Sequence, residues 1–153
     1  MLISIIIPAF SRRRKLELAA RSAADQVGIA KKDIEIIIVD DASPVPLAPP
    51  NGVENARVIR LAKNVGAAGA RNAGVSASSG EFIAFLDSDD SWRPKKLVSQ
   101  LRLAERCARS HDISRTAFAN AFYMPDRLAG DLEIRIPREA SAIRDFVGGC
   151  WMC

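Results

Sequence analysis

The stretch GEFIAFLDSDDSW, from Gly80 to Trp92, combines an apolar run with a dense group of acidic residues. Its mostly apolar residues 82–86 predict a buried strand. That strand runs directly into Asp87, Asp89 and Asp90, whose like charges repel one another unless a cation or a ligand offsets them. We therefore expect the carboxyl end of this strand to carry a ligand site.

Three more apolar runs of the same kind precede this one. Continuous β-branched runs are typical of strands that are covered on both faces of a sheet. Four prolines in residues 42–52 exclude a helix between the second and third runs. Strands that alternate with helical segments favour an α/β protein with a mostly parallel sheet flanked by helices. The expected strands are Leu2–Pro8, Ile34–Asp41, Ala56–Ala62 and Glu81–Asp87.

Helices are expected in three places. Ser11 can cap the first, which has apolar residues at spacings of three and four. The alanine-rich residues 65–80 predict a second helix that lies close against the sheet, and Pro94 predicts the first turn of a third. From Ser114 onward the pattern weakens to two possible strands and a short helix. The apolar face of the first helix consists of Leu16, Ala19, Ala20, Ala23 and Val27.

The composition fits one globular domain, with 153 residues of which 48% are hydrophobic and 26% charged. No apolar run is long enough to span a membrane, and Met1 leads directly into a strand, so we expect a cytoplasmic protein. The odd number of cysteines, 3, indicates reduced thiols. The net charge of +4 suits an anionic ligand. However, the dense basic run from Ser11 to Lys15 lacks interleaved aromatic residues, so we interpret it as a solvated helix face and expect no nucleic-acid partner.

Polar loops follow three of the expected strands, as PAFS, DDAS and DSDD. In an open parallel sheet such loops converge at the carboxyl edge, where ligands bind. Along an extended segment Asp87 and Asp89 project the same way about 6.6 Å apart, while Ser88 turns away. Their oxygens suit Mg²⁺ or Mn²⁺, with phosphate and water completing the coordination. Asp90 and Asp40 are instead expected to be solvated loop or cap residues.

Two further features strengthen what is otherwise a weak signal from two carboxylates. Asp41 follows the second strand, and the element KNVGAAGARNAG, Lys63 to Gly74, precedes the acid-bearing strand. Its glycines allow the backbone to approach a ligand closely, and Arg71 adds a charge that can approach phosphates. Close packing of a helix against the sheet also explains these glycines, and the two explanations are compatible.

The segments ISIIIPAF, IIIVDDAS, NVGAAGARNAGVSASSGEFIAFLDSDDSW and the following P..L together resemble the nucleotide-binding half of family 2 inverting glycosyltransferases. The similarity covers residues 2–101 in order and spacing. It implies the GT-A fold, a Rossmann-like, mostly parallel sheet flanked by helices, with its C-terminal part truncated. It also implies one domain over residues 1–153, in which residues 1–110 are the nucleotide-sugar-binding half and 111–153 the incomplete start of the acceptor-side half.

The resemblance implies roles for individual positions. The residues after the first strand are expected to hold the nucleoside, with Asp41 near the base. Asp87 is expected near the ribose, and Asp89 is expected to reach the metal that bridges the two phosphates. The implied nucleotide contacts are Pro8, Ala9, Phe10, Asp41, Asn64, Gly66, Arg71, Asn72, Asp87 and Ser88, and the implied ligands of Mg²⁺ or Mn²⁺ are Asp89 and Asp87.

The implied activity is transfer of a sugar from a nucleoside-diphosphate sugar, with a UDP-sugar favoured, to an acceptor hydroxyl with inversion and metal assistance. Relatives that build surface polysaccharides suggest a glycan or lipid-linked acceptor and peripheral association with the inner face of the membrane. The family carries its catalytic base in a later ED-like motif, and the chain ends at Cys153 before one, so no base is assigned.

Two alternatives to this activity were weighed. One is a nucleotide-binding fragment without transferase activity, because the base would lie beyond Cys153. The other is a phosphatase of the DxDx(T/V) type. It fails because that motif should end the first strand, and because Ser91 stands at its Thr/Val position.

Overall fold

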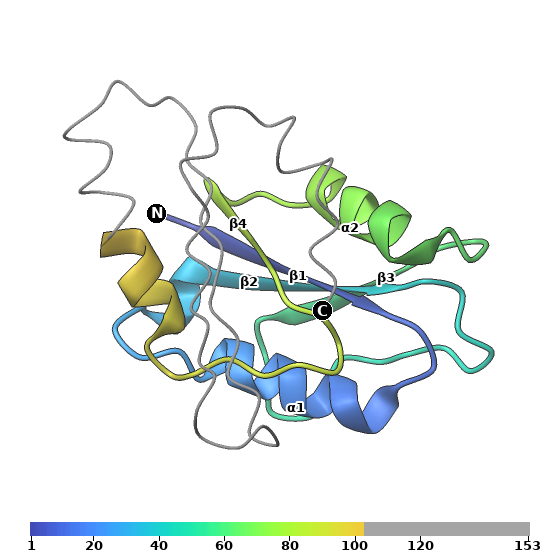
Figure 1. Cartoon of the computed structure of the whole chain (residues 1–153), viewed down its shortest axis with the longest axis horizontal. Helices are drawn as coiled ribbons and strands as arrows, with labels where there is room; N and C mark the ends of the chain where they lie inside the picture. Colours follow the sequence, from blue (N-terminus) through green and yellow to red (C-terminus); the bar gives the residue numbers. More distant parts are fainter. Residues whose placement is uncertain (103–153) are drawn as a thin grey trace, which may run out of the picture. The chain divides into compact units, whose positions relative to one another are not determined.

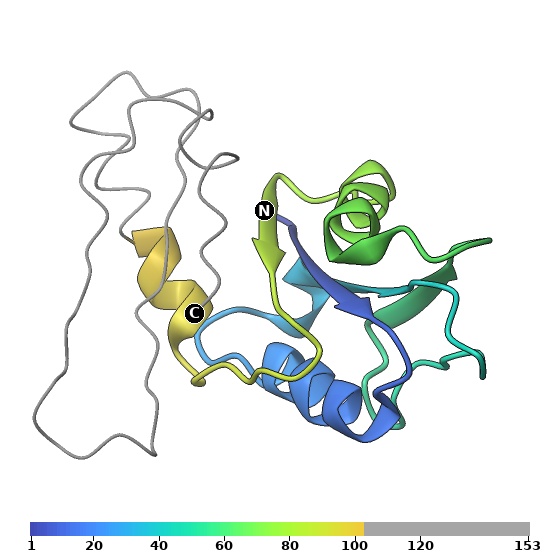
Figure 2. The ribbon, with the colours of Figure 1, turned by 45° about the vertical axis from the view of Figure 1, so that its right-hand side comes forward.

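The computed structural model describes residues 1–102, and the chain divides into two compact units, 1–101 and 102–153. The first unit contains a four-stranded sheet with the order β3-β2-β1-β4 and parallel pairing throughout. Figures 1 and 2 show its two long helices on opposite faces of the sheet. The expected parallel α/β architecture is confirmed. The elements are β1 (Ile3–Ala9), α1 (Arg13–Ala24), the short 3-10 helix η1 (Lys31–Asp33), β2 (Ile34–Asp40), β3 (Ala56–Arg60), α2 (Gly66–Ser76) and β4 (Phe82–Phe85).

The two central strands are buried on both faces. All of β1 is buried, and β2 is buried except for the half-buried Glu35. Alternation along β1 sends Ile5 and Ile7 to the face under α1 and Ile6 to the face under α2. Each fully buried isoleucine contributes about 1.5–3 kcal/mol to the free energy of unfolding. A sheet that is covered on both faces buries every residue of its central strands, and this explains the uninterrupted apolar runs.

The first helix packs on the sheet through the face that the sequence predicts, but two details were wrong. Ser11 does not cap it: the N-cap residue is Arg12, no side chain caps the helix, and Ser11 has a φ of 56°. The helix ends at Ala24, so Val27 lies beyond it and is 52% exposed. The buried residues of α1 are Leu16, Ala19, Ala20, Ala23 and Ala24.

The second helix lies against the opposite face through small side chains. A Cβ atom at Gly74 would be 2.4 Å from Cγ2 of Ile6 and 3.1 Å from Cγ2 of Val39. Ala70, one turn earlier, is fully buried on the same side. The predicted close packing of this helix is confirmed, because at Gly74 the sheet leaves room for a hydrogen atom only.

Strand β4 differs from the expectation of a buried strand. Phe82, Ile83 and Phe85 are 40%, 41% and 42% exposed, and only Leu86, directly after the strand, is buried. Among the described strands β4 pairs with β1 alone, so it is an edge strand of the part of the sheet that residues 1–102 form. An apolar run does not reveal whether a strand is central or at an edge, so the prediction that residues 82–86 are buried was wrong for most of them.

A polar cluster joins the amino end of the sheet to the connection between α2 and β4. Oγ of Ser4 donates a hydrogen bond to Oε2 of Glu35 at 2.6 Å and accepts one from the backbone N–H of Gly80 at 2.9 Å. The backbone N–H of Ser79 donates to the same carboxylate at 3.1 Å, and Nη2 of Arg57 lies 3.1 Å from Oε1. Burial alone would raise the pKa of Glu35, but these hydrogen bonds and the Arg57 charge lower it below its usual value.

The segment after the acidic residues is anchored to the end of α1. Gln26 accepts a hydrogen bond from the backbone N–H of Leu97 and donates one to the carbonyl of Arg93, each at 3.0 Å. The expected third helix is present as residues 96–102, two residues later than Pro94 suggested. No helix within these described residues is long and apolar enough to cross a membrane. The strands and helix expected from Ser114 onward lie outside the described residues.

Replacing Gly74 by alanine should destabilise the fold despite the higher helix propensity of alanine. The added methyl group would overlap Ile6, so we expect the free energy of unfolding to fall by about 1–3 kcal/mol. Gly69→Ala is the comparison in the same helix: its Cβ would lie 2.6 Å from Cγ2 and 3.0 Å from Cβ of Val65, which is 46% exposed and can shift toward solvent, so we expect a smaller loss. Denaturant unfolding measures both variants, and equal losses would contradict the packing explanation.

The free energy of unfolding should also depend on pH through Glu35. A carboxylate whose folded pKa is lowered stabilises the fold above its unfolded pKa, and this contribution is lost as the pH falls through the folded value. The difference in stability between the wild type and Glu35→Gln should therefore be largest above pH 4.5, the ordinary value for this side chain, and should shrink below it. A difference that stays constant across an acid titration would show that the Glu35 charge is not what matters.

Candidate functional site

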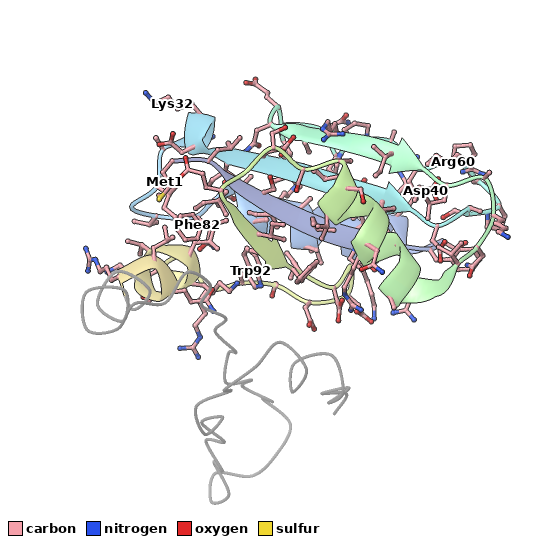
Figure 3. The ribbon with its side chains drawn as sticks, turned by 90° about the horizontal axis from the view of Figure 1, so that it is seen from above. Met1, Lys32, Asp40, Arg60, Phe82 and Trp92 are labelled. Atoms are coloured by element: carbon pink, nitrogen blue, oxygen red, sulfur yellow. The ribbon has the colours of Figure 1, made fainter. Side chains whose placement is uncertain are left out.

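The carboxyl ends of the strands meet at one edge of the sheet, as predicted. The backbone N–H of Asp41, directly after β2, donates a hydrogen bond to the carbonyl of Ala9 at the end of β1. Asp87 lies two residues beyond the end of β4. Figure 3 shows Asp40 and Arg60 together at this edge, where β2 and β3 end. The loops that carry the acidic residues therefore start at the same edge, on either side of the loop that follows β1.

Asp40, the last residue of β2, is a buried structural carboxylate rather than the solvated residue that we expected. Its side chain is 0% exposed and accepts hydrogen bonds from the backbone N–H groups of Ser43 at 2.9 Å and Leu47 at 3.2 Å. Nη1 of Arg60 lies 2.6 Å from Oδ2, and Nη2 donates to the carbonyl of Ser43. Burial alone would raise the pKa of Asp40, but the hydrogen bonds from Ser43, Leu47 and Arg60 lower it. Asp40 thus shapes the proline-rich loop.

Asp41 caps α2 from the end of a neighbouring strand. Its two carboxylate oxygens accept the backbone N–H groups of Val65 at 2.8 Å and Gly66 at 2.9 Å. Gly66 has a φ of 78°, which favours glycine, and Asn64 donates its side-chain N–H to the Asp41 carbonyl. A helix N-terminus attracts anions, and here the carboxylate of Asp41 already occupies that position. Asp41 is consequently 4% exposed.

The acidic cluster forms a turn, called the acidic turn below, in which Asp87 and Asp89 each meet an arginine. The backbone N–H of Asp90 donates to the Asp87 carbonyl at 3.1 Å, so the extended segment that we expected is wrong and Asp90 is a turn residue. Nη2 of Arg71, from α2, lies 2.5 Å from Oδ1 of Asp87, and Arg12 forms an ion pair with Asp89. Burial and then the neighbouring charges of Asp87 and Asp89 raise the pKa of Asp90.

Arg12 is the site residue that sequence reasoning missed. It belongs to the basic run that we interpreted as a solvated helix face, but it precedes α1 and contacts an acid 77 positions later in the chain. Local patterns do not reveal a contact over that separation. The only available signal was the position of the run, since it directly follows the first strand, whose end reaches the same edge of the sheet.

The other expected nucleotide contacts differ in what they can offer. Pro8 and Ala9 are buried within β1, whereas Phe10 is 45% exposed at the start of the following loop. Ser88 is 7% exposed, so its side chain points away from the solvent that its acidic neighbours face. Asn72 is exposed on α2, and within residues 1–102 no hydrogen bond joins its side chain to the rest of the set.

The carboxylate oxygens at the acidic turn fit a divalent cation that takes its remaining ligands from a bound substrate. Asp87 and Asp89 are 49% and 38% exposed, and each supplies hard carboxylate oxygens. No group of three or more His, Cys, Asp or Glu in the described part of the chain could hold a metal ion. Mg²⁺ and Mn²⁺ commonly use one or two carboxylates together with substrate phosphates, and the residues present fit that arrangement.

Comparison with curated sequences finds relatives that are named as glycosyltransferases. The chain is 39% identical over 107 residues to the UDP-Glc:alpha-D-GlcNAc-diphosphoundecaprenol beta-1,3-glucosyltransferase WfaP of Escherichia coli, covering 68% of this chain and 41% of the relative. It is 38% identical over 105 residues to the putative teichuronic acid biosynthesis glycosyltransferase TuaG of Bacillus subtilis, covering 65% and 40%. The chain therefore spans about two fifths of the length of these relatives.

Comparison with solved structures supports the same fold. Staphylococcus aureus TarS 1-349 in complex with UDP-GlcNAc superposes with a TM-score of 0.60 at 25% identity, over 69% of this chain and 32% of that one. The mannosyltransferase PcManGT of Pyrobaculum calidifontis, in complex with GDP-Man and Mn²⁺, gives 0.55 at 18% identity, over 65% and 31%, which shows the fold alone. The GT-A fold that the sequence resemblance implied is confirmed.

The family model described as Glycosyl transferase family 2 matches residues 4–152, nearly the whole chain. Its match begins within β1 and includes the acidic turn and the arginines Arg12 and Arg71 that pair with it. The chain belongs to glycosyl transferase family 2.

Proposed function

We propose that the described residues form the donor site of a glycosyltransferase that uses a nucleoside-diphosphate sugar, with a UDP-sugar favoured. One observation carries the proposal: at the carboxyl edge, two exposed carboxylates and two guanidinium groups are held together as the pairs Asp87 with Arg71 and Asp89 with Arg12. A divalent cation bound to a diphosphate presents the complementary set of charges, since the cation pairs with carboxylates and the phosphates pair with guanidinium groups.

The position of α2 supports placing the diphosphate at the acidic turn. A phosphate would otherwise favour the N-terminus of this helix, but the Asp41 carboxylate already accepts the N–H groups there. Arg71 lies five residues after Gly66 on the same helix, and its guanidinium group is already at Asp87. The phosphates therefore find their positive partners beside Asp87 rather than at the start of α2.

The nucleoside is assigned to the loops that follow β1 and β2. Phe10 is exposed and can contact a base or ribose, while the buried Pro8 and Ala9 contribute backbone groups. Asp41 and Asn64 lie beside the first turn of α2, and Asn72 is exposed further along that helix. Gly66 and the backbone of Ser88 complete the proposed set.

The metal role is assigned to Asp89 and Asp87, which would hold Mg²⁺ or Mn²⁺ together with the diphosphate oxygens. A divalent cation bound there would neutralise the charge that develops on the leaving diphosphate. The fold neighbour PcManGT was solved with GDP-Man and Mn²⁺, which is consistent with this assignment. Arg71 would pair with the same phosphates once it leaves Asp87.

The proposed reaction is attack of an acceptor hydroxyl on the anomeric carbon with inversion of its configuration. We assign none of the acidic residues at this edge as the catalytic base, because each carboxylate already accepts a hydrogen bond or forms an ion pair. These residues are Asp40, Asp41, Asp87 and Asp89. The name of the WfaP relative specifies a lipid-linked diphosphate acceptor. A glycan or lipid-linked acceptor at the inner face of a membrane, and a role in polysaccharide biosynthesis, are proposed by analogy with it.

Metal-dependent nucleotide binding should require Asp89 but not its neighbour Asp90. In calorimetric titrations of the full chain with UDP, adding Mn²⁺ should strengthen binding, and Asp89→Ala should weaken the metal-dependent part at least tenfold, since it removes a direct ligand. Asp90→Ala removes the same charge from the same turn and should retain it. If both variants bind alike, or if Mn²⁺ has no effect on the wild type, the metal assignment is wrong. Parallel titrations with GDP and dTDP test the preference for UDP.

A transfer assay separates the glycosyltransferase from a nucleotide-binding fragment without activity. Because the family resemblance implies a base in a later ED-like motif, we expect the full chain to bind UDP with Mn²⁺ but to form little product from a UDP-sugar and a polyprenyl-diphosphate-linked acceptor. Product formation well above the level of Asp89→Ala would contradict this expectation. It would mean that the chain supplies a base of its own.

A further inference from the structure

The carboxylates of Asp87 and Asp89 are not free in this structure, because arginines from two different elements pair with them. Arg71 of α2 approaches Asp87, and Arg12, at the N-cap position of α1, approaches Asp89. The Arg12 guanidinium group therefore stands at the carboxylate that is the proposed ligand of the divalent cation. A cation cannot take its place on that oxygen until the guanidinium group moves.

The backbone of Arg12 is fixed although its side chain is 55% exposed. The N–H of Ser11 donates to Oγ of Ser43 at 2.9 Å, and the carbonyl of Arg12 accepts the N–H of Leu16 in the first turn of α1. Ser11 has the left-handed φ of 56°, a strained conformation for a residue other than glycine that costs on the order of 1 kcal/mol or more. Such strain persists only where the surroundings impose it, and Ser43 is one source.

Ser43 is in turn positioned by the buried carboxylate of Asp40. Its N–H donates to Oδ1 of Asp40, and its carbonyl accepts Nη2 of Arg60. Ser43 is 1% exposed, so the hydroxyl group that receives the Ser11 N–H is itself buried. The chain of contacts from Asp40 through Ser43 and Ser11 therefore aims Arg12 at the acidic turn.

We propose that Arg12 is a tethered cation that competes with the divalent metal for Asp89 and pairs with the diphosphate once metal and nucleotide bind together. The proposal rests on the proposed donor site. An arginine suits both roles because its guanidinium group stays charged and matches carboxylate and phosphate geometry equally well. In the empty site it neutralises Asp89 and disfavours the bare metal. In the loaded site the phosphates offer it a new partner.

The two roles predict opposite effects of one substitution. Arg12→Gln removes the competitor, so Mn²⁺ alone should bind about twofold to fivefold more tightly, as expected for the loss of an exposed ion pair. The same variant loses a charged contact to phosphate, so UDP should bind the Mn²⁺-loaded protein about tenfold more weakly. The coupling between metal and nucleotide therefore falls. Arg12→Lys keeps the charge and should lie between wild type and Arg12→Gln in both measurements.

Arg13→Gln is the matched control. It removes the same charge from the adjacent residue, but Arg13 is 72% exposed and lies near Glu17 of its own helix. Arg13→Gln therefore shows how far the loss of one positive charge, without the loss of the Asp89 ion pair, changes the affinities for Mn²⁺ and UDP. In addition, Arg12→Gln introduced into Asp89→Asn should not change Mn²⁺ binding, since the competition requires both partners.

Free Mn²⁺ measured by electron paramagnetic resonance, and UDP binding measured by calorimetry, give both affinities on the full chain without any activity assay. The proposal is overturned if Arg12→Gln changes the two affinities no more than Arg13→Gln does, or if both change in the same direction. If the wild type fails to bind Mn²⁺ and UDP together, the proposed donor site fails and this inference with it. If the wild type binds them and only the Arg12 effect is missing, the proposed donor site is retained and the competition by Arg12 is wrong.

Discussion

The buried carboxylate of Asp40 is the constraint on which the carboxyl edge depends. A charge taken fully out of water is costly unless it is paired and hydrogen-bonded, and Asp40 is satisfied by Arg60 and by two backbone N–H groups of the loop that follows. That requirement folds the proline-rich segment back onto the end of β2. It also holds Ser43, whose hydroxyl group receives the N–H of Ser11 from the neighbouring loop. The buried charge of Asp40 thus determines how the loops after β1 and β2 meet at the candidate site.

The helix α2 plays the corresponding role on the other face of the sheet. Its first turn is held by the Asp41 carboxylate, its middle approaches the strands at Gly74, and the connection after it is tied to Glu35 through Ser79. With both ends and the centre fixed, the helix has little freedom to slide. Arg71 is therefore delivered to Asp87 by a rigid element, which suits a residue that is expected to contact a ligand.

The sequence predicted the central part of the fold well because local patterns determine it. The isoleucine runs of β1 and β2, the small residues of α2 and the order of the elements all follow from periodicity and composition. The details that failed depend on distant contacts. The edge position of β4 among the described strands depends on which strands pair with one another. The burial of Asp40 depends on its ion pair with Arg60, which lies 20 positions away in the chain. The left-handed Ser11 likewise depends on a partner 32 positions later in the chain.

The candidate site shows the same division. The acidic residues could be recognised in the sequence because they directly follow an apolar strand. Their mutual repulsion indicated that positive charges must lie nearby. The described structure meets this repulsion with arginines from α2 and from the loop before α1, not with a fixed cage of protein ligands. Two exposed ion pairs stabilise a fold only weakly, so they can be exchanged at little cost. If a metal diphosphate binds as proposed, the two paired carboxylates gain the cation and the two arginines gain the phosphates, so the proposed site would favour the complete donor over either of its charged parts.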